Sequence, residues 1–296
     1  MALNHQYRLF GLNLSSEIEL PELVPSNSGF PDVAIRRGVV EEPACISIAD
    51  VARFSVIGGV EIIVEAAPGV QERNVRLYLL GSAMGQLLHQ RGLLPLHANA
   101  LEVGGRVVAV LGPSGAGKST LAAWLMTKGC RLLSDDVCVV RFHEAGPAVY
   151  PGVPRLRLWG ESLDVLGHPR AGLKRAYAGG DRWDKWDVPI ASALPAEDGL
   201  GLRALYLLDD GADIQIMPMA GASAVGAVSA NTYRGDYLTE PSALQTHWRA
   251  CVRLAAAVPV FRLQRPRDLT RLDALGETLL AHQRSVEAVR TGAAVR

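Results

Sequence analysis

The chain has 296 residues, of which 49% are hydrophobic and 20% charged, enough to bury one large core or two modest ones. Lysine plus arginine and aspartate plus glutamate both total 30, so no charge excess attracts nucleic acid or an anionic membrane, and we expect neither as a partner. The four cysteines have no metal-ligand spacing. Without a membrane-length apolar run or a signal-peptide pattern, the sequence predicts a cytoplasmic protein.

The N-terminal part of the chain predicts short strands followed by one helix. Residues 7–20, 32–39 and 55–65 carry alternating or β-branched apolar residues, with turn-forming clusters between them. Residues 71–90 have apolar side chains at helical spacing, and this helix can pack on either part of the chain. We expect residues 1–92 to form a strand-rich N-terminal region that ends in this helix.

The remaining chain predicts a core that mixes strands and helices. A hairpin is expected over 96–111, with its turn at Gly104-Gly105, and a second over 202–219 around Asp210-Gly211. Residues 147–198 are rich in Pro, Gly and Trp, and predict loops around a short helix. The other expected elements are helices 120–128, 222–230, 242–257 and 268–289 and strands 137–142 and 258–262. We expect residues 93–290 to form an α/β domain and 291–296 a flexible tail.

A complete phosphate-binding motif lies between an apolar strand and a helix. It reads Gly112-Pro113-Ser114-Gly115-Ala116-Gly117-Lys118-Ser119, and Thr120 follows. In such a loop the backbone N–H groups surround phosphate oxygens, the lysine reaches the β- and γ-phosphates, and the hydroxyl ligates Mg²⁺. The alternative is a glycine-rich turn that binds nothing. The strand before and the helix after the motif favour binding of a nucleoside triphosphate.

Two consecutive carboxylates follow the phosphate loop by one helix. Phosphoryl transfer needs a carboxylate for the metal ion and a group that orients the acceptor, and Asp135 and Asp136 can supply both. Neighbouring residues on a strand point to opposite faces, so one aspartate serves the site while the other caps a turn, or an irregular backbone turns both inward. A solvated turn is the alternative.

Other polar side chains near these motifs leave two interpretations open. His97 begins the strand before the phosphate-loop strand, where it can reach the phosphates or be a satisfied core residue. Arg155 and Arg157 share one strand face, which suits either phosphate recognition or solvent. Lys174, Arg175 and Lys185 are predicted to be solvated rather than to close over a triphosphate.

Three segments in register resemble the HPr kinase/phosphorylase family, whose catalytic domain has a P-loop fold related to phosphoenolpyruvate carboxykinase. They are Leu96-His97-Ala98, the phosphate loop, and Arg131-Leu132-Leu133-Ser134-Asp135-Asp136. The intervals between them match the family's pattern. The resemblance implies an α/β fold with a P-loop kinase core of mixed β-sheet and helices, and an enzyme that uses ATP and Mg²⁺.

The resemblance also implies a role for each site residue. Lys118 would bind the transferring phosphates, and Ser119 and Asp135 would serve Mg²⁺. Asp136 would be the base that takes the proton of an acceptor serine, and His97 and Asp135 would be supporting groups. Residues 112–120 would hold the nucleotide.

The chain departs from the bifunctional members of this family. Thr120 stands where they usually have Glu, and their long glycine-containing signature has no counterpart after Asp136. The whole chain is more similar to shorter, divergent proteins encoded beside ribosomal-peptide clusters, including lasso-peptide kinases, on segments 231–234 and 261–266. This predicts a serine kinase acting on a precursor peptide or small protein, with a homo-oligomer possible. An HPr kinase/phosphorylase that regulates sugar uptake and a non-catalytic ATP-binding module are the alternatives.

Overall fold

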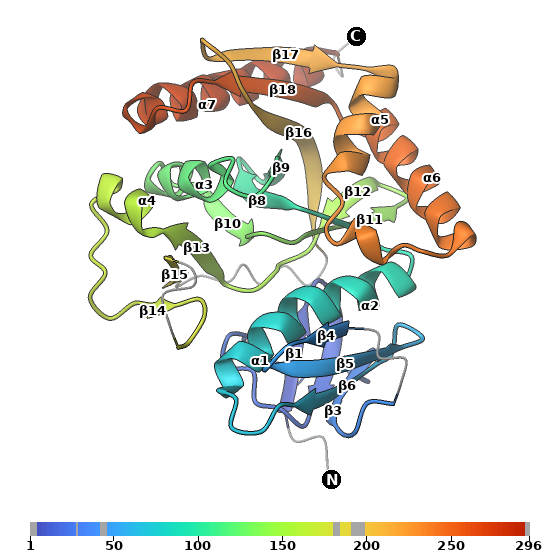
Figure 1. The fold of residues 1–296 in the computed structure, drawn as a ribbon. Helices are drawn as coiled ribbons and strands as arrows, with labels where there is room; N and C mark the ends of the chain where they lie inside the picture. The colour runs from blue at the N-terminus through green and yellow to red at the C-terminus, as the bar shows by residue number, and fades with distance from the viewer. Residues whose placement is uncertain (1–4, 28, 42–45, 180–183, 191–198, 294–296) are drawn as a thin grey trace.

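The computed structural model describes residues 5–293 except 28, 42–45, 180–183 and 191–198. A small N-terminal sheet and a larger α/β unit lie one above the other in Figure 1, with a helix between them. No helix in these residues combines the length and the apolar character that crossing a membrane requires.

The described N-terminal residues form a six-stranded sheet in the order β1-β2-β3-β6-β5-β4. Its strands are β1 (His5–Leu9), β2 (Leu12–Ser16), β3 (Val33–Arg37), β4 (Ile46–Ile48), β5 (Ala52–Ile57) and β6 (Glu61–Ala66). Alternation puts one set of side chains in the core, as with Phe54 and Val56 on β5. The three predicted strand regions are confirmed, and the short strand β4 was not predicted.

The predicted helix over 71–90 is confirmed, with one irregularity. It consists of α1 (Glu72–Tyr78), a π-helical turn η1 (Leu79–Ala83) and α2 (Met84–Gln90). Its buried residues Val75, Leu79 and Leu87 share a core with the N-terminal sheet, so the helix packs on this sheet. The same core includes Val137 and Val139 of the larger unit, which joins the two parts.

In the described part of the larger unit, nine strands form one mixed sheet. They are β7 (Leu94–Leu96), β8 (Ala98–Val103), β9 (Arg106–Leu111), β10 (Arg131–Ser134), β11 (Cys138–His143), β12 (Gly146–Val149), β16 (Leu200–Asp210), β17 (Gln215–Met219) and β18 (Val260–Arg265). The order is β10-β8-β9-β16-β12-β11-β7, and β18 pairs with both β16 and β17. The hairpin predicted over 96–111 is confirmed as β8 and β9, with Ala98 opposite Leu111.

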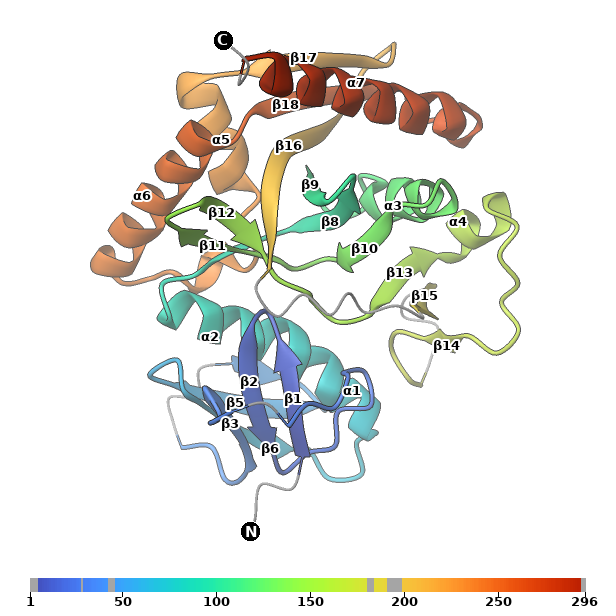
Figure 2. The ribbon, with the colours of Figure 1, turned by 180° about the vertical axis from the view of Figure 1, so that it is seen from behind.

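Helices cover both faces of this sheet (Figures 1 and 2). They are α3 (Lys118–Thr127) and α7 (Leu272–Ala293) on one face and α5 (Gly221–Ala230) and α6 (Pro241–Ala257) on the other. On β9, Val108 and Val110 pack in the α3–α7 core, whereas Ala109 and Leu111 pack in the α5–α6 core. Burial on both faces explains why this strand is a continuous apolar run.

Two predictions for the larger unit were wrong. Residues 147–198 are not only loops, because they contain β12 and a three-stranded sheet in the order β13-β15-β14. The strands of this small sheet are β13 (Arg155–Trp159), β14 (Lys174–Arg175) and β15 (Lys185–Pro189), and α4 (Gly160–Val165) follows β13. The strands β16 and β17 exist but do not form a hairpin, since β18 lies between them and pairs with each. Turn residues report local geometry and contain no information on such a long-range pairing.

The C-terminal helix extends further than the sequence predicts. After the short 3₁₀ turns η2 (Gly235–Tyr237) and η3 (Leu269–Arg271), α7 runs to Ala293. Residues 291–293, expected in a flexible tail, are therefore helical, and 294–296 lie outside the described residues.

The N-terminal helix is joined to the small sheet by polar contacts. Arg73 on α1 donates from Nη2 to Asp187 Oδ2 at 2.6 Å and from Nε to the Arg175 carbonyl at 2.9 Å. The amide of Asn74 both donates to and accepts from the backbone of Ala178, at 2.8 Å in each direction. The small sheet is thus held by the N-terminal unit as well as by the larger one.

We expect Gly276→Ala to lower the free energy of unfolding by about 1–3 kcal/mol, the usual cost of overpacking. A Cβ at Gly276 on α7 would overlap the indole ring of Trp124 on α3. That ring is 4% exposed and its Nε1 donates to Asp273 at 2.5 Å, so it has little freedom to move. The overlap outweighs the gain in helix propensity of about 1 kcal/mol that alanine normally provides.

Urea denaturation followed by circular dichroism measures this change. The matched control is Gly226→Ala on α5, where a Cβ meets nothing within 4 Å. The control is expected to be neutral or stabilising. Equal stability of Gly276→Ala and the wild-type protein would show that α3 and α7 do not pack this closely.

Candidate functional site

The phosphate loop connects the end of β9 to the start of α3, and its glycines are required by the backbone. Gly112, Gly115 and Gly117 have φ of 149°, 79° and 92°. A Cβ at Gly112 would also lie 3.2 Å from the Leu208 carbonyl oxygen. Gly117 precedes the first residue of α3, so the loop ends at a helix N-terminus, which favours an anion.

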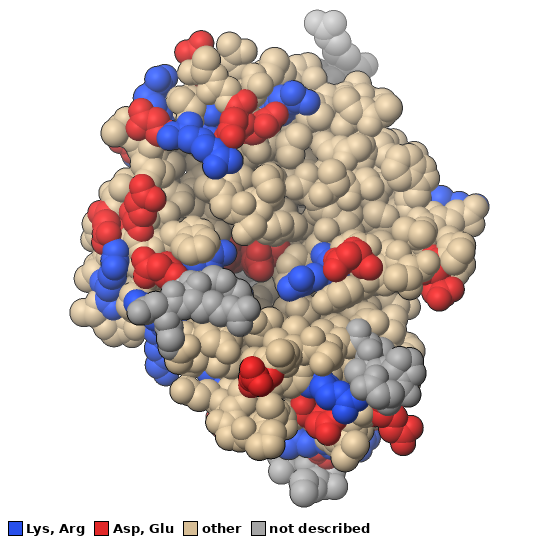
Figure 3. Space-filling view, viewed as in Figure 1, with Lys and Arg blue, Asp and Glu red and all other residues tan. Residues whose placement is uncertain are grey.

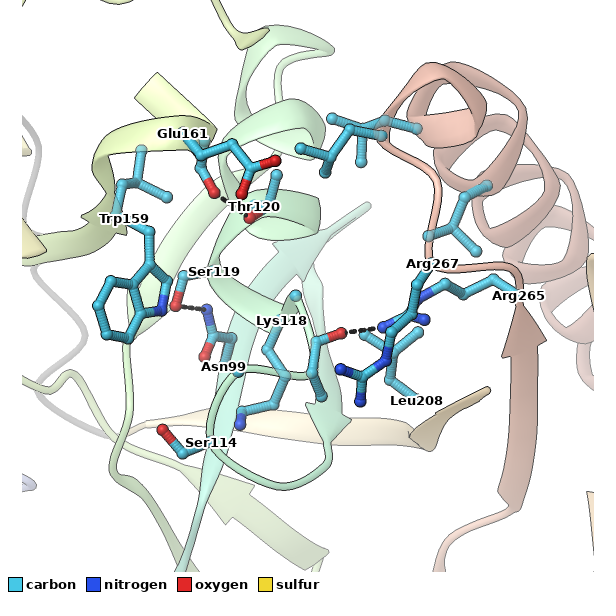
Figure 4. A pocket seen from close by; sticks show the side chains of 18 of the residues that line it. Asn99, Ser114, Lys118, Ser119, Thr120, Trp159, Glu161, Leu208, Arg265 and Arg267 are labelled. Atoms are coloured by element: carbon cyan, nitrogen blue, oxygen red, sulfur yellow. Dashed lines mark hydrogen bonds between the residues drawn. The ribbon is translucent and has the colours of Figure 1, made fainter. Parts of the chain in front are cut away.

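Lys118 lies at the mouth of this loop (Figure 4). Its side chain is buried, and Nζ donates to the carbonyls of Gly112 at 2.6 Å and Pro113 at 3.0 Å. Burial lowers the pKa of Lys118 to about 8, although the nearby carboxylates of Asp136 and Asp135 oppose this shift. An arriving phosphate would favour the charged ammonium in the same way.

Oxygen atoms gather beside the first turn of α3. Ser119 Oγ donates to Asp135 Oδ1 at 3.0 Å and lies 3.3 Å from the Asn99 amide nitrogen, which donates to it. Asn99 Oδ1 is buried and has no hydrogen-bond partner in the described structure. Such hard oxygen donors suit Mg²⁺, which is commonly held by one or two protein groups together with the phosphates of its substrate.

These donors fit a metal ion only when the nucleotide completes the set. Among the described residues, no group of three or more His, Cys, Asp or Glu side chains can hold a metal. Burial raises the pKa of Asp135 to about 6, with a further contribution from the charge of Asp136. The Arg157 N–H, which donates to Asp135 Oδ2 at 2.8 Å, and the Ser119 hydroxyl oppose this shift. A bound cation would also favour the carboxylate.

Both aspartates turn toward the site because the backbone between β10 and β11 is irregular. Asp136 has φ of 70°, an uncommon conformation for a residue other than glycine that aspartate tolerates better than most. This is the second of the two arrangements that the sequence allowed. Strand β10 is antiparallel to β8, as β9 is, so β10 and β9 run in the same direction and end at the same edge of the sheet.

His97 connects the lysine to the second aspartate. It lies between β7 and β8, and its backbone N–H donates to the Asn231 carbonyl at 2.7 Å. Its Nε2 lies 3.1 Å from Asp136 Oδ1 and 3.2 Å from Lys118 Nζ. When Nε2 carries a proton it can donate to the Asp136 carboxylate. When Nε2 is deprotonated it can accept from the Lys118 ammonium. The alternative of a core histidine is therefore wrong for His97.

Asp136 is held in its ionised form. Burial favours the neutral acid, but the hydrogen bond and charge of His97 outweigh it, and two basic side chains of the small sheet, Arg157 and Lys185, add to this effect. The pKa of Asp136 therefore lies well below its usual range. Its carboxylate is 39% exposed, and that exposure is toward a cavity that it lines.

The sequence only partly predicts the basic groups that the small sheet contributes, since it left Arg157 open and predicted Lys185 to be solvated. Arg157 and Lys185 both line the site, while Lys174 and Arg175 are not among its lining residues. Arg157 Nε donates to Asp187 at 3.1 Å, and its Nη2 is buried without a partner in the described structure. Lys185 Nζ lies 4.9 Å above the Trp159 ring. The prediction that Lys185 is merely solvated is wrong, and only the strand alternation around Arg157 signalled that its side chain could face the site.

A buried arginine from a distant strand supports the phosphate loop. Arg265 at the end of β18 donates from Nη2 to the Ala116 carbonyl and from Nη1 to Asp210 at 2.7 Å (Figure 4). Thr120 follows the loop motif, and its hydroxyl forms a hydrogen bond of 2.8 Å with the Ser162 hydroxyl on α4. The loop is thus supported from both sides, and no motif identified either contact.

Two cavities meet at these groups. A smaller one of about 270 Å³ follows the phosphate loop and the start of α3 to the connection between β18 and α7. A larger one of about 760 Å³ extends toward α1 and the connection between α5 and α6. The residues that line both cavities are His97, Ser114, Ser119, Asp136, Arg157, Trp159 and Lys185. A ligand in each cavity would therefore meet the other at His97 and Asp136.

Comparisons with known proteins add little to this geometry. No protein-family model and no curated protein matches the chain. Among solved structures, the chain is similar to the Hpr(Ser) kinase/phosphatase from Coxiella burnetii, with 14% sequence identity and a TM-score of 0.34. The match covers 68% of this chain and 98% of that one.

Proposed function

We propose that this protein is an ATP- and Mg²⁺-dependent kinase with a phosphoenolpyruvate-carboxykinase-like P-loop core, which phosphorylates serine on a peptide or small protein. One observation carries the proposal: the carboxylate of Asp136 lies beside the phosphate loop and lines a second cavity, 3.1 Å from the His97 nitrogen that is also 3.2 Å from Lys118 Nζ. A module that only binds nucleotide needs no carboxylate in that place.

The two cavities supply the arrangement that in-line transfer requires. The nucleotide would lie in the smaller cavity, with its phosphates on the N–H groups of residues 112–119 and on Lys118. Its terminal phosphoryl group would then be at the junction, and the acceptor would approach from the larger cavity. Holding both reactants in line is a large part of catalysis in phosphoryl transfer.

The described oxygen donors fit the metal ion. Ser119, Asp135 and the unpartnered Asn99 carbonyl would hold Mg²⁺, with the remaining ligands from phosphates and water. When bound, Mg²⁺ neutralises charge that develops on the phosphate oxygens.

The protein's own side chains would act on the acceptor and on the developing charge. Asp136 accepts a hydrogen bond from the serine hydroxyl, orients it, and takes its proton as the new P–O bond forms. The cationic groups of Arg157 and Lys185 lie where they can stabilise the transferring phosphoryl group.

The acceptor class rests on sequence resemblance together with the size of the larger cavity. The similarity to lasso-peptide kinases supports a ribosomally synthesised precursor peptide as the substrate. We propose that the enzyme acts in the cytoplasm, because such a peptide is made there. We also propose that it forms a homo-oligomer.

The test is to incubate the protein with γ-labelled ATP, Mg²⁺ and a cognate precursor peptide, and to measure the peptide by mass spectrometry. A gain of one phosphate on a serine is expected. Labelling of purified HPr and not of the peptide would favour the HPr kinase alternative. Tight nucleotide binding, with the masses of the peptide and of HPr both unchanged, would favour the alternative of a non-catalytic ATP-binding module.

A further inference from the structure

The larger cavity has walls from parts of the chain that lie far apart in the sequence. Leu77 on α1 contributes from the N-terminal unit, and Trp159 and Ala176 from the small-sheet region. Residues 229–230 at the end of α5 and 232–236 of the connection between α5 and α6 also contribute to the lining. Figure 3 shows a hollow in the middle of this face, with acidic atoms at its floor and basic atoms beside it. Asp136 is one of the residues that line this cavity, so an acceptor must enter the cavity to reach its carboxylate.

Tyr233, in the connection between α5 and α6, packs closely against the N-terminal helix. A Cβ on Gly85 would lie 3.0 Å from Tyr233 Cε1, and one on Gly81 would lie 3.2 Å from Tyr233 Oη. Gly81 belongs to the π-helical turn, so the irregular part of the helix lies directly against this ring. π-Helical turns inside helices are frequent at functional sites.

The same connection is tied to His97. The ring of Tyr233 meets that of His97 edge to face at 6.3 Å between centroids. Its backbone N–H donates to the Pro95 carbonyl at 2.9 Å, and its own carbonyl lies 2.8 Å from His89 Nε2. Burial raises the pKa of the Tyr233 phenol to about 12, so the phenol stays uncharged. The N-terminal helix, the connection and His97 therefore form one packed wall.

The edge of this wall, at Arg234 and Tyr237, includes one residue in a strained backbone conformation. Arg234 has φ of 53°, in the left-handed region, and its guanidinium lies over the rings of Tyr233 and Tyr237 at 5.7 and 5.9 Å. A residue other than glycine keeps such a conformation only where its surroundings compensate for it. The contacts around Arg234 thus hold this edge of the cavity in one conformation before any ligand binds.

The walls of the cavity around Asp136 limit which acceptors can reach it. A serine hydroxyl is separated from the backbone by one methylene group, so the acceptor's backbone must itself enter the cavity. A serine on a broad folded surface cannot do this, whereas an extended segment is narrow enough. A cavity of about 760 Å³ has the volume that encloses a ligand the size of a few residues.

We propose that the larger cavity is the acceptor site, that it takes an extended peptide segment, and that the N-terminal unit forms one of its walls through Leu77 and the helix beneath Tyr233. This inference rests on the proposed kinase function and adds to it the conformation of the acceptor and the surface that recognises it.

The first test substitutes Leu77, which lines the larger cavity but not the smaller one that follows the phosphate loop. The probe is a degenerate, serine-centred dodecapeptide library with γ-labelled ATP. Leu77→Arg is expected to lower labelling of the library at least 10-fold and to leave ATP affinity within about twofold. Leu77→Ala, which cannot clash, is expected to raise the KM for the library with a smaller change in kcat. The matched control is Leu244→Arg on the solvent side of α6, where the leucine is 46% exposed, and it is expected to behave as the wild type.

The second test compares one sequence in two conformations. Ribonuclease A is presented either native or reduced and carboxymethylated, so that the same serines lie in a folded or an unfolded chain. Label on the library and on the unfolded preparation, but not on the native one, supports the proposal. Equal labelling of native ribonuclease, or full activity of Leu77→Arg, would overturn it. ATP binding with no labelling of any peptide would overturn the acceptor site alone, whereas a wild-type protein that does not bind ATP would remove the kinase function itself.

Discussion

Asp136→Asn is expected to lower phosphate transfer by about 10²–10⁴-fold, the contribution that a positioned general base usually makes. The amide cannot take the proton of the acceptor hydroxyl. Asparagine tolerates the left-handed conformation that Asp136 adopts, with φ of 70°, so the turn between β10 and β11 should persist. ATP affinity is expected to be retained or to rise, since a negative charge near the triphosphate is lost. The measurement is single-turnover transfer from radiolabelled ATP, with ATP binding followed by titration calorimetry.

The control for this variant is Asp213→Asn, which makes the same chemical change at an exposed residue between β16 and β17. It is expected to turn over as the wild type does. Normal turnover in Asp136→Asn would remove this carboxylate from the role of base and would leave the site as a nucleotide-binding one.

Lys118→Met should weaken ATP binding roughly 10- to 100-fold and slow the reaction as well. A hydrogen bond to a charged group contributes about 1.5–3 kcal/mol, and each 1.4 kcal/mol corresponds to a factor of ten. Methionine keeps most of the length of the side chain, so the buried site is not emptied. The variant also deprives His97 of the ammonium 3.2 Å from its Nε2, which should impair the orientation of that ring.

Calorimetric titration of each protein with ATP and Mg²⁺ measures this effect. Lys128→Met, beyond the other end of α3, is the matched control, because Lys128 is exposed and its Nζ lies over the Trp124 ring. An unchanged binding isotherm for Lys118→Met would contradict the assignment of the loop as a phosphate cradle.

The sequence was sufficient to predict the parts of the site that lie on local motifs. The phosphate loop and the Asp135-Asp136 pair are defined by short patterns, and the strands and helices that flank them have clear periodicity. For this reason Lys118, Ser119 and both aspartates lie together as predicted. The irregular turn at Asp136 was one of two alternatives, since propensity does not distinguish a turn from a strand start at an Asp-Asp pair.

The basic half of the site was not predictable in the same way. Arg157 and Lys185 reach the phosphate loop only because β13 pairs with β15, and the partners Arg157 and Asp187 are 30 residues apart. Asn99 and Arg265 depend on long-range packing too, with Arg265 bonded to a loop residue 149 positions earlier. Pairings of this kind are selected by the shape of the whole core, and no local pattern encodes them.

The contacts of Arg73 and Asn74 with the small sheet have a practical meaning for recombination. Strand β15, which carries Lys185, and the nearby backbone of Ala178 are held by side chains of a helix that belongs to the N-terminal unit. A hybrid protein that exchanges residues 1–92 for those of another chain would lose these contacts to the small-sheet region, unless the donor segment also presents an arginine and an asparagine at these two positions. Replacement of this unit would therefore have to preserve two residues that do not line either cavity.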